Sequence, residues 1–369
     1  MDVSIEKVIN QTPNFMNYKL QTLAGENLFI GIDSHLKSWK ISIYSDMLEL
    51  KTFTQPAVSS KLMDYLHKHY PGANYHCVYE AGFSGFSVHR ELTQMGANCI
   101  VTHPADVPTS DKERKSKSDK VDSRKLARGL KNGELKAIFI PDKLQEQDRA
   151  LLRTRDRVIR NRTRVKNRIK SFLMYWGITL PEGFQGKTWS KDFLLWLKKV
   201  PLSSSCRSAL NTYLAEVNHL SQSLGLLDQD IKQLSNSSRY ASKVKLLMGI
   251  PSIGLTSAMI LLTEIGDINR FKTFKALCCY FGLIPNTKSS GETERTGRMT
   301  KRGNRHLKYI LIECDWTAMR KDPALLMSFK AAAVKTTPNK AIIKVARKLL
   351  NRIRFVLKSE EQYVIGVVQ

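Results

Sequence analysis

The chain has 369 residues, of which 59 are Lys or Arg and only 33 are Asp or Glu, giving a formal net charge of +26. The hydrophobic content of 42% excludes a disordered chain, and the absence of any apolar run near ~18 residues excludes a membrane-spanning protein. Because so large a positive excess repels itself unless a polyanion neutralises it, we expect a nucleic acid partner rather than a membrane surface. The N-terminus carries acidic residues and no apolar core, so we expect no signal peptide and a cytoplasmic, nucleoid-associated protein.

After a polar N-terminal lead-in (residues 1–26), short strands and helices alternate. Apolar and alternating runs separated by turn residues predict three successive strands, and amphipathic segments then alternate with two more. The predicted strands cover residues 28–33, 39–44, 48–55, 75–82 and 98–106, and the helices cover residues 59–70 and 87–96. This βββαβαβ order, followed by a helix, predicts an RNase H-like mixed sheet over residues 27–142.

A long basic helix is predicted over residues 145–177, where apolar residues recur at helical spacing between arginines and lysines. A second helical pattern covers residues 210–235, so we expect an antiparallel pair or a coiled-coil arm over residues 143–240. The apolar stripe of the basic helix is a candidate dimer coil. Its predicted nucleic-acid contacts are Arg153, Arg157, Arg160, Arg164 and Arg168. The alternative is that any one of these arginines belongs to a solvated charged surface.

Residues 241–369 predict a mostly helical domain that opens with a helix-hairpin-helix-like turn, GIPSIG, at residues 249–254. Within it, residues 285–308 read PNTKSSGETERTGRMTKRGNRHLK. Serine, glycine and lysine are typical of a surface loop, but the same loop could place the hydroxyl of Ser289 or Ser290 against a phosphate. The basic residues predicted to neutralise nearby phosphates are Arg295, Arg298, Lys301, Arg302 and Arg305.

Four carboxylates are candidate metal ligands. Asp33 and Glu80 end the first and fourth predicted strands, which are neighbours in this topology, and Asp119 and Asp122 share one face of the following helix. Together they would repel one another unless cations neutralise them, and two Mg²⁺ ions, or Mn²⁺, would do so. Taken singly, a strand-end aspartate is usually a turn or cap residue, and Asp119 is a candidate cap for the helix. The six cysteines form no CxxC pair and the eight histidines no HxxxH pair, so we expect no zinc site.

Several stretches resemble the DEDD-type insertion-sequence transposases of the "one-ten" and "eleven-eleven" groups. They are GIDSHLKSWKISIY, VYEAGFSGF, KSDKVDSRKLARG and the long segment from GIPSIG to HLK. The resemblance implies a RuvC-like N-terminal domain and a C-terminal transposase domain. It also implies that Asp33, Glu80, Asp119 and Asp122 bind metal, and that Ser290, directly before Gly291, attacks DNA to form a phosphoserine link.

The same resemblance implies partners. Such proteins are guided by a structured non-coding RNA (a bridge RNA) that pairs with donor and target DNA. They assemble as a tetramer built from two dimers, in which one subunit's serine completes another's metal site. Two alternatives remain open. One is a RuvC-like junction resolvase or RNase H-like nuclease that uses water, and the other is a non-catalytic nucleic-acid-binding protein.

Overall fold

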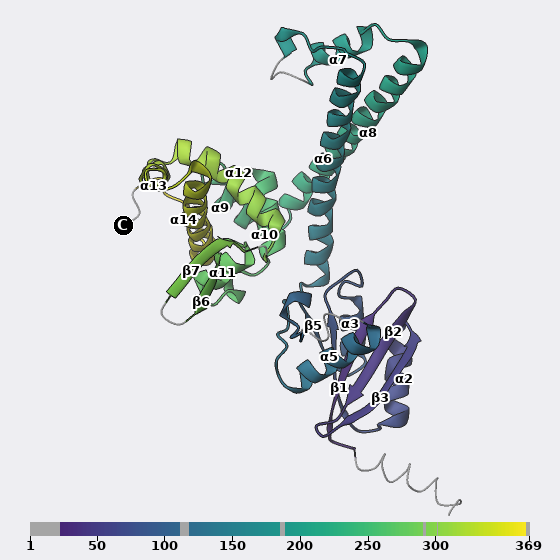
Figure 1. The fold of residues 1–369 in the computed structure, drawn as a ribbon. Coiled ribbons are helices and arrows are strands. Elements are labelled where there is room, and N and C mark those ends of the chain that lie inside the picture. The colour runs from purple at the N-terminus through teal and green to yellow at the C-terminus, as the bar shows by residue number, and fades with distance from the viewer. Residues whose placement is uncertain (1–22, 111–117, 185–188, 291–292, 301, 367–369) are drawn as a thin grey trace, which may run out of the picture. The chain divides into compact units, whose positions relative to one another are not determined.

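A computed structural model describes residues 23–110, 118–184, 189–290, 293–300 and 302–366, and side chains throughout these ranges except at residues 287–290 and 293–296. The chain divides into two compact units, Met1–Ile140 and Pro141–Gln369 (Figure 1). In these described ranges, no helix has the length and apolar character needed to cross a membrane.

The first unit is built on a five-stranded mixed sheet with the order β3-β2-β1-β4-β5. Its strands are β1 (Asn27–Ser34), β2 (Ser38–Tyr44), β3 (Glu49–Pro56), β4 (Asn74–Glu80) and β5 (Asn98–Thr102). The first three strands pair antiparallel, whereas β1 with β4 and β4 with β5 pair parallel. This is the predicted RNase H-like arrangement, in which the first and fourth strands are neighbours.

Helices cover both faces of this sheet (Figure 1). On one face α2 (Ser59–His69) and α3 (Ser87–Gln94) bury Leu62 and Leu92 against strand residues such as Ile30. On the other face α5 (Asp119–Lys131) packs Leu126 against Val78 of β4. Because successive strand residues point to opposite faces, alternate positions of β1 and β4 meet these two layers.

The second unit begins with two long helices, α6 (Lys143–Tyr175) and α8 (Ser204–Ser235), joined through α7 (Lys191–Lys199). They run antiparallel: Leu152 near the start of α6 shares a core with Ile231 near the end of α8, whereas Ile169 near the end of α6 shares a core with Leu210 near the start of α8. The apolar stripe of the basic helix is thus buried by α8 of the same chain. That is the antiparallel pair predicted from the sequence.

The rest of the second unit is a helical domain around one large core. Its helices are α9 (Ala241–Met248), α10 (Leu255–Ile265), α11 (Phe274–Tyr280), α12 (Arg305–Lys321), α13 (Pro323–Ala333) and α14 (Pro338–Ser359). The GIPSIG turn joins α9 to α10 as expected. Buried residues at helical spacing along α14, including Val345, Leu349 and Ile353, pack this basic helix against the core.

One element departs from the sequence expectation of a loop. Residues 285–299 form a two-stranded antiparallel ribbon, with β6 (Pro285–Ser290) and β7 (Thr293–Met299). Among the described residues the ribbon pairs with no third strand, so its sequence does not need the apolar alternation that signals a strand in a packed sheet.

Candidate functional site

Asp33 and Glu80 lie at the same edge of the sheet. The parallel register pairs Ile32 of β1 with Tyr79 of β4, so the next residues, Asp33 and Glu80, follow side by side at the carboxyl ends of adjacent strands. Asp33 lies two positions after Gly31, and Glu80 two after Val78, so both belong to the face that α5 covers. The two acids therefore occupy the edge predicted for them.

The first turn of α5 holds the other two acids. Asp119 is the first residue of the helix and Asp122 lies three residues later, so both are in its first turn. The cap of this helix is Ser118, whose hydroxyl accepts a hydrogen bond from the backbone N–H of Val121. Because Ser118 fills the cap position, the alternative role of Asp119 as the cap is not the one the structure uses.

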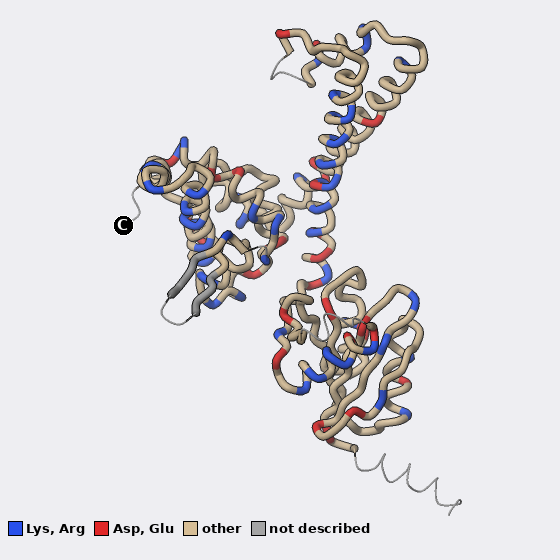
Figure 2. The backbone as a smooth tube through the Cα atoms, viewed as in Figure 1, with Lys and Arg blue, Asp and Glu red and all other residues tan. Residues whose placement is uncertain are grey.

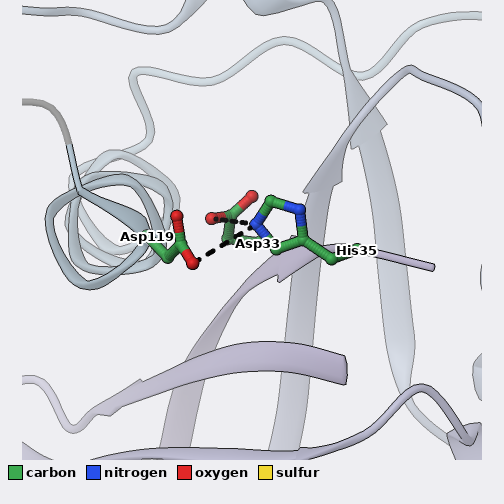
Figure 3. A group of neighbouring side chains, drawn as sticks. All are labelled: Asp33, His35 and Asp119. Atoms are coloured by element: carbon green, nitrogen blue, oxygen red, sulfur yellow. Dashed lines mark hydrogen bonds and ion pairs between the residues drawn. The ribbon is translucent and has the colours of Figure 1, made fainter. Parts of the chain in front are cut away.

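A histidine that the sequence reasoning did not single out joins this group. His35 Nε2 lies 3.2 Å from Oδ2 of Asp33 and 3.6 Å from Oδ2 of Asp119, and Figure 3 shows the imidazole facing both carboxylates. One ligand atom from each of these three residues lies within 4.8 Å of the others. The sequence signal for His35 is the Asp-x-His spacing at a strand end, whereas the expectation of no zinc site rests on His–His spacing alone.

The electrostatics of this cluster (Asp33, His35 and Asp119) favour a cation. Burial raises the pKa of Asp33, the charges of Asp119 and Asp122 raise it further, and His35 lowers it. Asp122 is paired with Lys125 at 2.9 Å on the next turn of α5. The donor set of carboxylates and an imidazole fits a divalent ion such as Mn²⁺, and carboxylates alone fit Mg²⁺.

Three contacts fix α5 over the strands. A Cβ on Gly31 would lie 2.1 Å from the backbone oxygen of Ser123, so only glycine allows the helix this close to β1. The buried hydroxyls of Ser42 and Ser123 are 2.9 Å apart, and Arg124 pairs with Glu49 of β3 at 2.6 Å. The GID sequence therefore has two roles. Gly31 allows α5 to pack closely on β1, and Asp33 lies near Asp119 of that helix.

The candidate nucleophile lies on the ribbon of the second unit. Ser290 is the last residue of β6 and its register partner is Thr293, the first residue of β7. The side chains of Ser289, Ser290 and Arg295 lie outside the described residues, as do Gly291 and Lys301 altogether. The structure therefore places the backbone of Ser290 at the end of the ribbon away from Pro285 and Met299.

The opposite end of the ribbon is held tightly. A Cβ on Gly303 would lie 2.5 Å from the nitrogen of Gly282, so the chain segments before β6 and after β7 are in direct backbone contact. The backbone N–H of Asn304 donates to the carbonyl of Tyr280 at 2.6 Å, and that of Thr300 donates to Ile284 at 2.9 Å. The ribbon thus projects from a rigid base.

The described basic residues predicted to contact nucleic acid are exposed, and some of those on α6 are paired with acidic residues. The predicted contacts Arg153, Arg157, Arg160, Arg164 and Arg168 are all exposed along the helix, which carries much of the positive charge in this region (Figure 2). Arg160 pairs with Asp156, and Arg168 with Glu216 at 3.5 Å. Arg302 and Arg305, near the start of α12, are exposed too, and so is Arg298 on β7.

Arg153 has a structural partner that the sequence did not reveal. Its Nε and Nη2 donate to the carboxylate of Glu264 at 2.6 and 2.9 Å, and Glu264 is 1% exposed. The Nδ2 of Asn304 also donates to Glu264, at 2.8 Å, while Oδ1 of Asn304 caps α12. Glu264 therefore links the basic helix α6 to the base of the ribbon.

Comparisons with known proteins match both units. The family model DEDD_Tnp_IS110, described as a transposase, matches residues 30–176, and the model described as "Transposase IS116/IS110/IS902 family" matches residues 244–330. The first match covers the strands and helix of the acid cluster, and the second covers α10 to α12 with the ribbon.

Curated relatives carry matching names. A "Putative transposase y4rJ" of Sinorhizobium fredii is 30% identical over 302 residues, which is 74% of each chain. The "Transposase for insertion sequence element IS1111A" of Coxiella burnetii is 26% identical over 259 residues, 69% of this chain and 70% of that protein. A "Putative transposase y4qE" of Sinorhizobium fredii is 30% identical over 66% of this chain, and the match spans only 58% of that relative's length. With two family models matching in the expected order, the chain belongs to the IS110 family of transposases.

Proposed function

We propose that this protein is the recombinase of an insertion sequence, which cuts and rejoins donor and target DNA through a covalent phosphoserine link at Ser290. The observation that carries the proposal is the convergence of Asp33, Asp119 and His35 at the edge of a RuvC-like sheet. In the same chain, the residues that match the second transposase model, 244–330, include Ser290. Family membership supports the reaction class, and the acid cluster supports the metal dependence.

The chemistry balances without an external energy source. The Oγ of Ser290 forms a bond to phosphorus while the bond from phosphorus to one sugar oxygen breaks, and the serine proton passes to solvent or to the leaving oxygen. In the rejoining step a hydroxyl of the new partner strand displaces the serine oxygen. One phosphodiester is exchanged for one phosphoserine ester and back.

The acids would hold the metal that this reaction needs. Asp33, Glu80, Asp119 and Asp122 supply carboxylate oxygens, and His35 orients Asp33 and Asp119 or supplies a nitrogen ligand. A bound Mg²⁺ or Mn²⁺ would polarise the scissile phosphate and lower the pKa of an attacking hydroxyl. Burial, together with repulsion from Asp119 and Asp122, raises the pKa of Asp33, and a bound cation would stabilise its charged form.

We further infer that a structured guide RNA selects the DNA sites and that the active form is a dimer assembling into a tetramer. The net charge of +26 and the exposed arginines along α6 support contacts with nucleic acid backbones. Such backbone contacts carry no sequence information, which suits a protein that leaves sequence recognition to base pairing. Sequencing the RNA that copurifies with the protein tests this part of the proposal.

The nucleophile is tested by trapping the covalent adduct. End-labelled DNA carrying the element's junction, incubated with protein and Mg²⁺, should yield a protein–DNA band that survives denaturation. Ser290→Ala should abolish this band, whereas Ser289→Ala, its matched neighbour, should retain it.

The outcomes separate the candidate functions. Cleavage without an adduct in the Ser290→Ala variant would contradict the phosphoserine mechanism and support a nuclease that uses water. An unchanged reaction in Asp33→Asn would contradict the role of the acids, and no reaction in any variant or in the wild type would favour a binding protein.

A further inference from the structure

A cavity opens beside the base of the ribbon in the second unit. Its volume is about 630 Å³, within the range of about 300–1,000 Å³ typical of small-ligand sites. It is bounded by the end of β7, the following loop and the first turns of α12. The side chains that matter here are Phe281, Met299, Arg302, Arg305, Lys308 and Tyr309.

One face of α12 forms a wall of this cavity. Arg305, Lys308, Tyr309 and Ile312 follow the i, i+3, i+4, i+7 spacing and therefore share a face. Leu307 and Leu311, on the other face, are buried in the core. The helix thus places two cationic side chains, an aromatic ring and an aliphatic side chain along the wall of the same cavity.

The chemistry of the lining is cationic and apolar together. Among the residues that the structure describes, the lining contains Arg302, Arg305 and Lys308 but no Asp or Glu, and it includes the fully buried ring of Phe281. Burial lowers the pKa of Lys308, because its charged ammonium is partly removed from water. A ligand that brings a negative charge would stabilise this ammonium.

Tyr309 adds a stacking surface. The residue is 58% exposed although it lines the cavity. A large aromatic ring held at the rim of a cationic pocket is the arrangement that receives an unpaired base, whose flat face stacks while its phosphate meets Lys or Arg. A base inside a duplex is stacked on both sides and cannot enter.

We propose that this cavity binds one unpaired nucleotide of the DNA strand that is being cut. The inference rests on the proposed function, because the position of Ser290 on the same ribbon identifies the strand. From Pro285 to Ser290 the strand advances five residues, or ~17 Å at about 3.3 Å per residue. At about 3.4 Å per stacked nucleotide, the bound base lies ~5 nucleotides from the attacked phosphate.

The test uses fluorescent oligonucleotides and the full-length protein. A short single-stranded DNA from the element end carries 2-aminopurine at successive positions, and its binding is compared with that of the fully paired duplex. Tyr309→Ala should weaken binding of the single strand at least about fivefold and remove the quenching of one 2-aminopurine position. Tyr309→Phe should restore both, and binding of the duplex should change little.

A matched control is available on α6. Tyr175 is 81% exposed on a helix, so Tyr175→Ala should leave single-strand binding unchanged. Equal losses on single strand and duplex in Tyr309→Ala, or no loss, would overturn the proposal. Binding of the equivalent RNA strand more tightly than the DNA would also overturn it, because the occupant would then be guide RNA.

Failure of the pocket and failure of the proposed function give different results. If wild-type protein forms no covalent adduct while the 2-aminopurine signal depends on Tyr309, the cavity binds an unpaired nucleotide but the phosphoserine mechanism is contradicted. If the adduct forms and Tyr309→Ala binds single strands as wild type does, the mechanism stands and the pocket fails.

Discussion

The two units use carboxylates in opposite ways. In the first unit, Asp33 and Asp119 approach each other with His35 as the one cation-forming side chain between them among the described residues, and burial and the neighbouring acids raise the pKa of Asp33. In the second unit, Glu264 is more deeply buried but is surrounded by donors from Arg153 and Asn304, with Arg149 at 3.6 Å. Burial alone therefore does not identify a functional acid.

What distinguishes the two groups is whether their charge is already neutralised. A buried carboxylate with arginine and amide partners holds elements together, and removing one partner is costly. Clustered carboxylates with too few cations are poised for a metal ion and destabilise the fold without it. The comparison predicts that substitutions at the two groups will change stability in opposite directions.

The largest effect on stability is expected at Glu264. Glu264→Ala leaves Arg153 and Asn304 without their acceptor and should lower the free energy of unfolding by about 3–5 kcal/mol, measured by urea denaturation of the full chain. The matched control is Asp228→Ala, which removes an exposed partner of Arg155 and should cost less than about 1 kcal/mol. Equal costs would contradict a structural role special to Glu264.

The next effect is expected where α5 meets the sheet. Gly31→Ala would force α5 away from β1, because the new Cβ would lie 2.5 Å from the nitrogen of Ala127, and should cost about 1–3 kcal/mol while weakening divalent-ion binding. The control is Gly225→Ala in α8, where a Cβ meets nothing within 4 Å, and there stability should rise by about 0.5–1 kcal/mol. Undiminished ion affinity in Gly31→Ala would show that α5 does not position the acids.

A pH-dependent effect is expected at Asp315 in α12. Its carboxylate is fully buried, neither oxygen has a hydrogen-bond partner among the described residues, and burial raises its pKa well above the usual range. The folded chain therefore binds this proton more tightly than the unfolded chain, so wild-type stability falls as pH rises above the ordinary aspartate value.

Asp315→Asn removes that titration. The variant should be more stable than wild type at pH 7, and the difference should shrink as pH falls toward 4, measured as the midpoint of thermal unfolding. A difference that stays constant with pH would mean that Asp315 does not titrate differently on folding.

The smallest effect is expected from a single exposed arginine of α6. Arg157→Gln should reduce the slope of log affinity against log salt by about 1 for DNA or RNA, through loss of one phosphate contact. Arg155→Gln is the comparison, since Arg155 already pairs with Asp228 at 2.5 Å and should change the slope less. Identical slopes for wild type and Arg157→Gln would exclude this residue from the nucleic-acid surface.

The sheet and the helix pair were predictable because their apolar patterns are strong and local. Alternation in β2 and the helical stripe of α6 each reflect a single buried face. The edge carrying Asp33 and Glu80 followed from strand order alone, since parallel neighbours end at the same edge. The ribbon of β6 and β7 was not predictable, because its polar sequence has the composition of a loop.

Partners distant in sequence were also beyond prediction. Arg153 and Glu264 are 111 residues apart, so nothing local distinguishes Arg153 from the other arginines of the helix. His35 is a different case, because its spacing from Asp33 was visible in the sequence. Its contact with Asp119 depends on the position of α5, which the packing at Gly31 decides.

The central claim, that the edge of the first sheet is a metal site serving DNA cleavage, is tested most directly by titrating Mn²⁺ into wild type and Asp33→Asn and following the free ion by electron paramagnetic resonance. The account predicts saturable binding to the wild type, binding weakened at least tenfold in Asp33→Asn, and loss of the covalent DNA adduct in the same variant. Undiminished Mn²⁺ affinity and adduct formation in Asp33→Asn would contradict it.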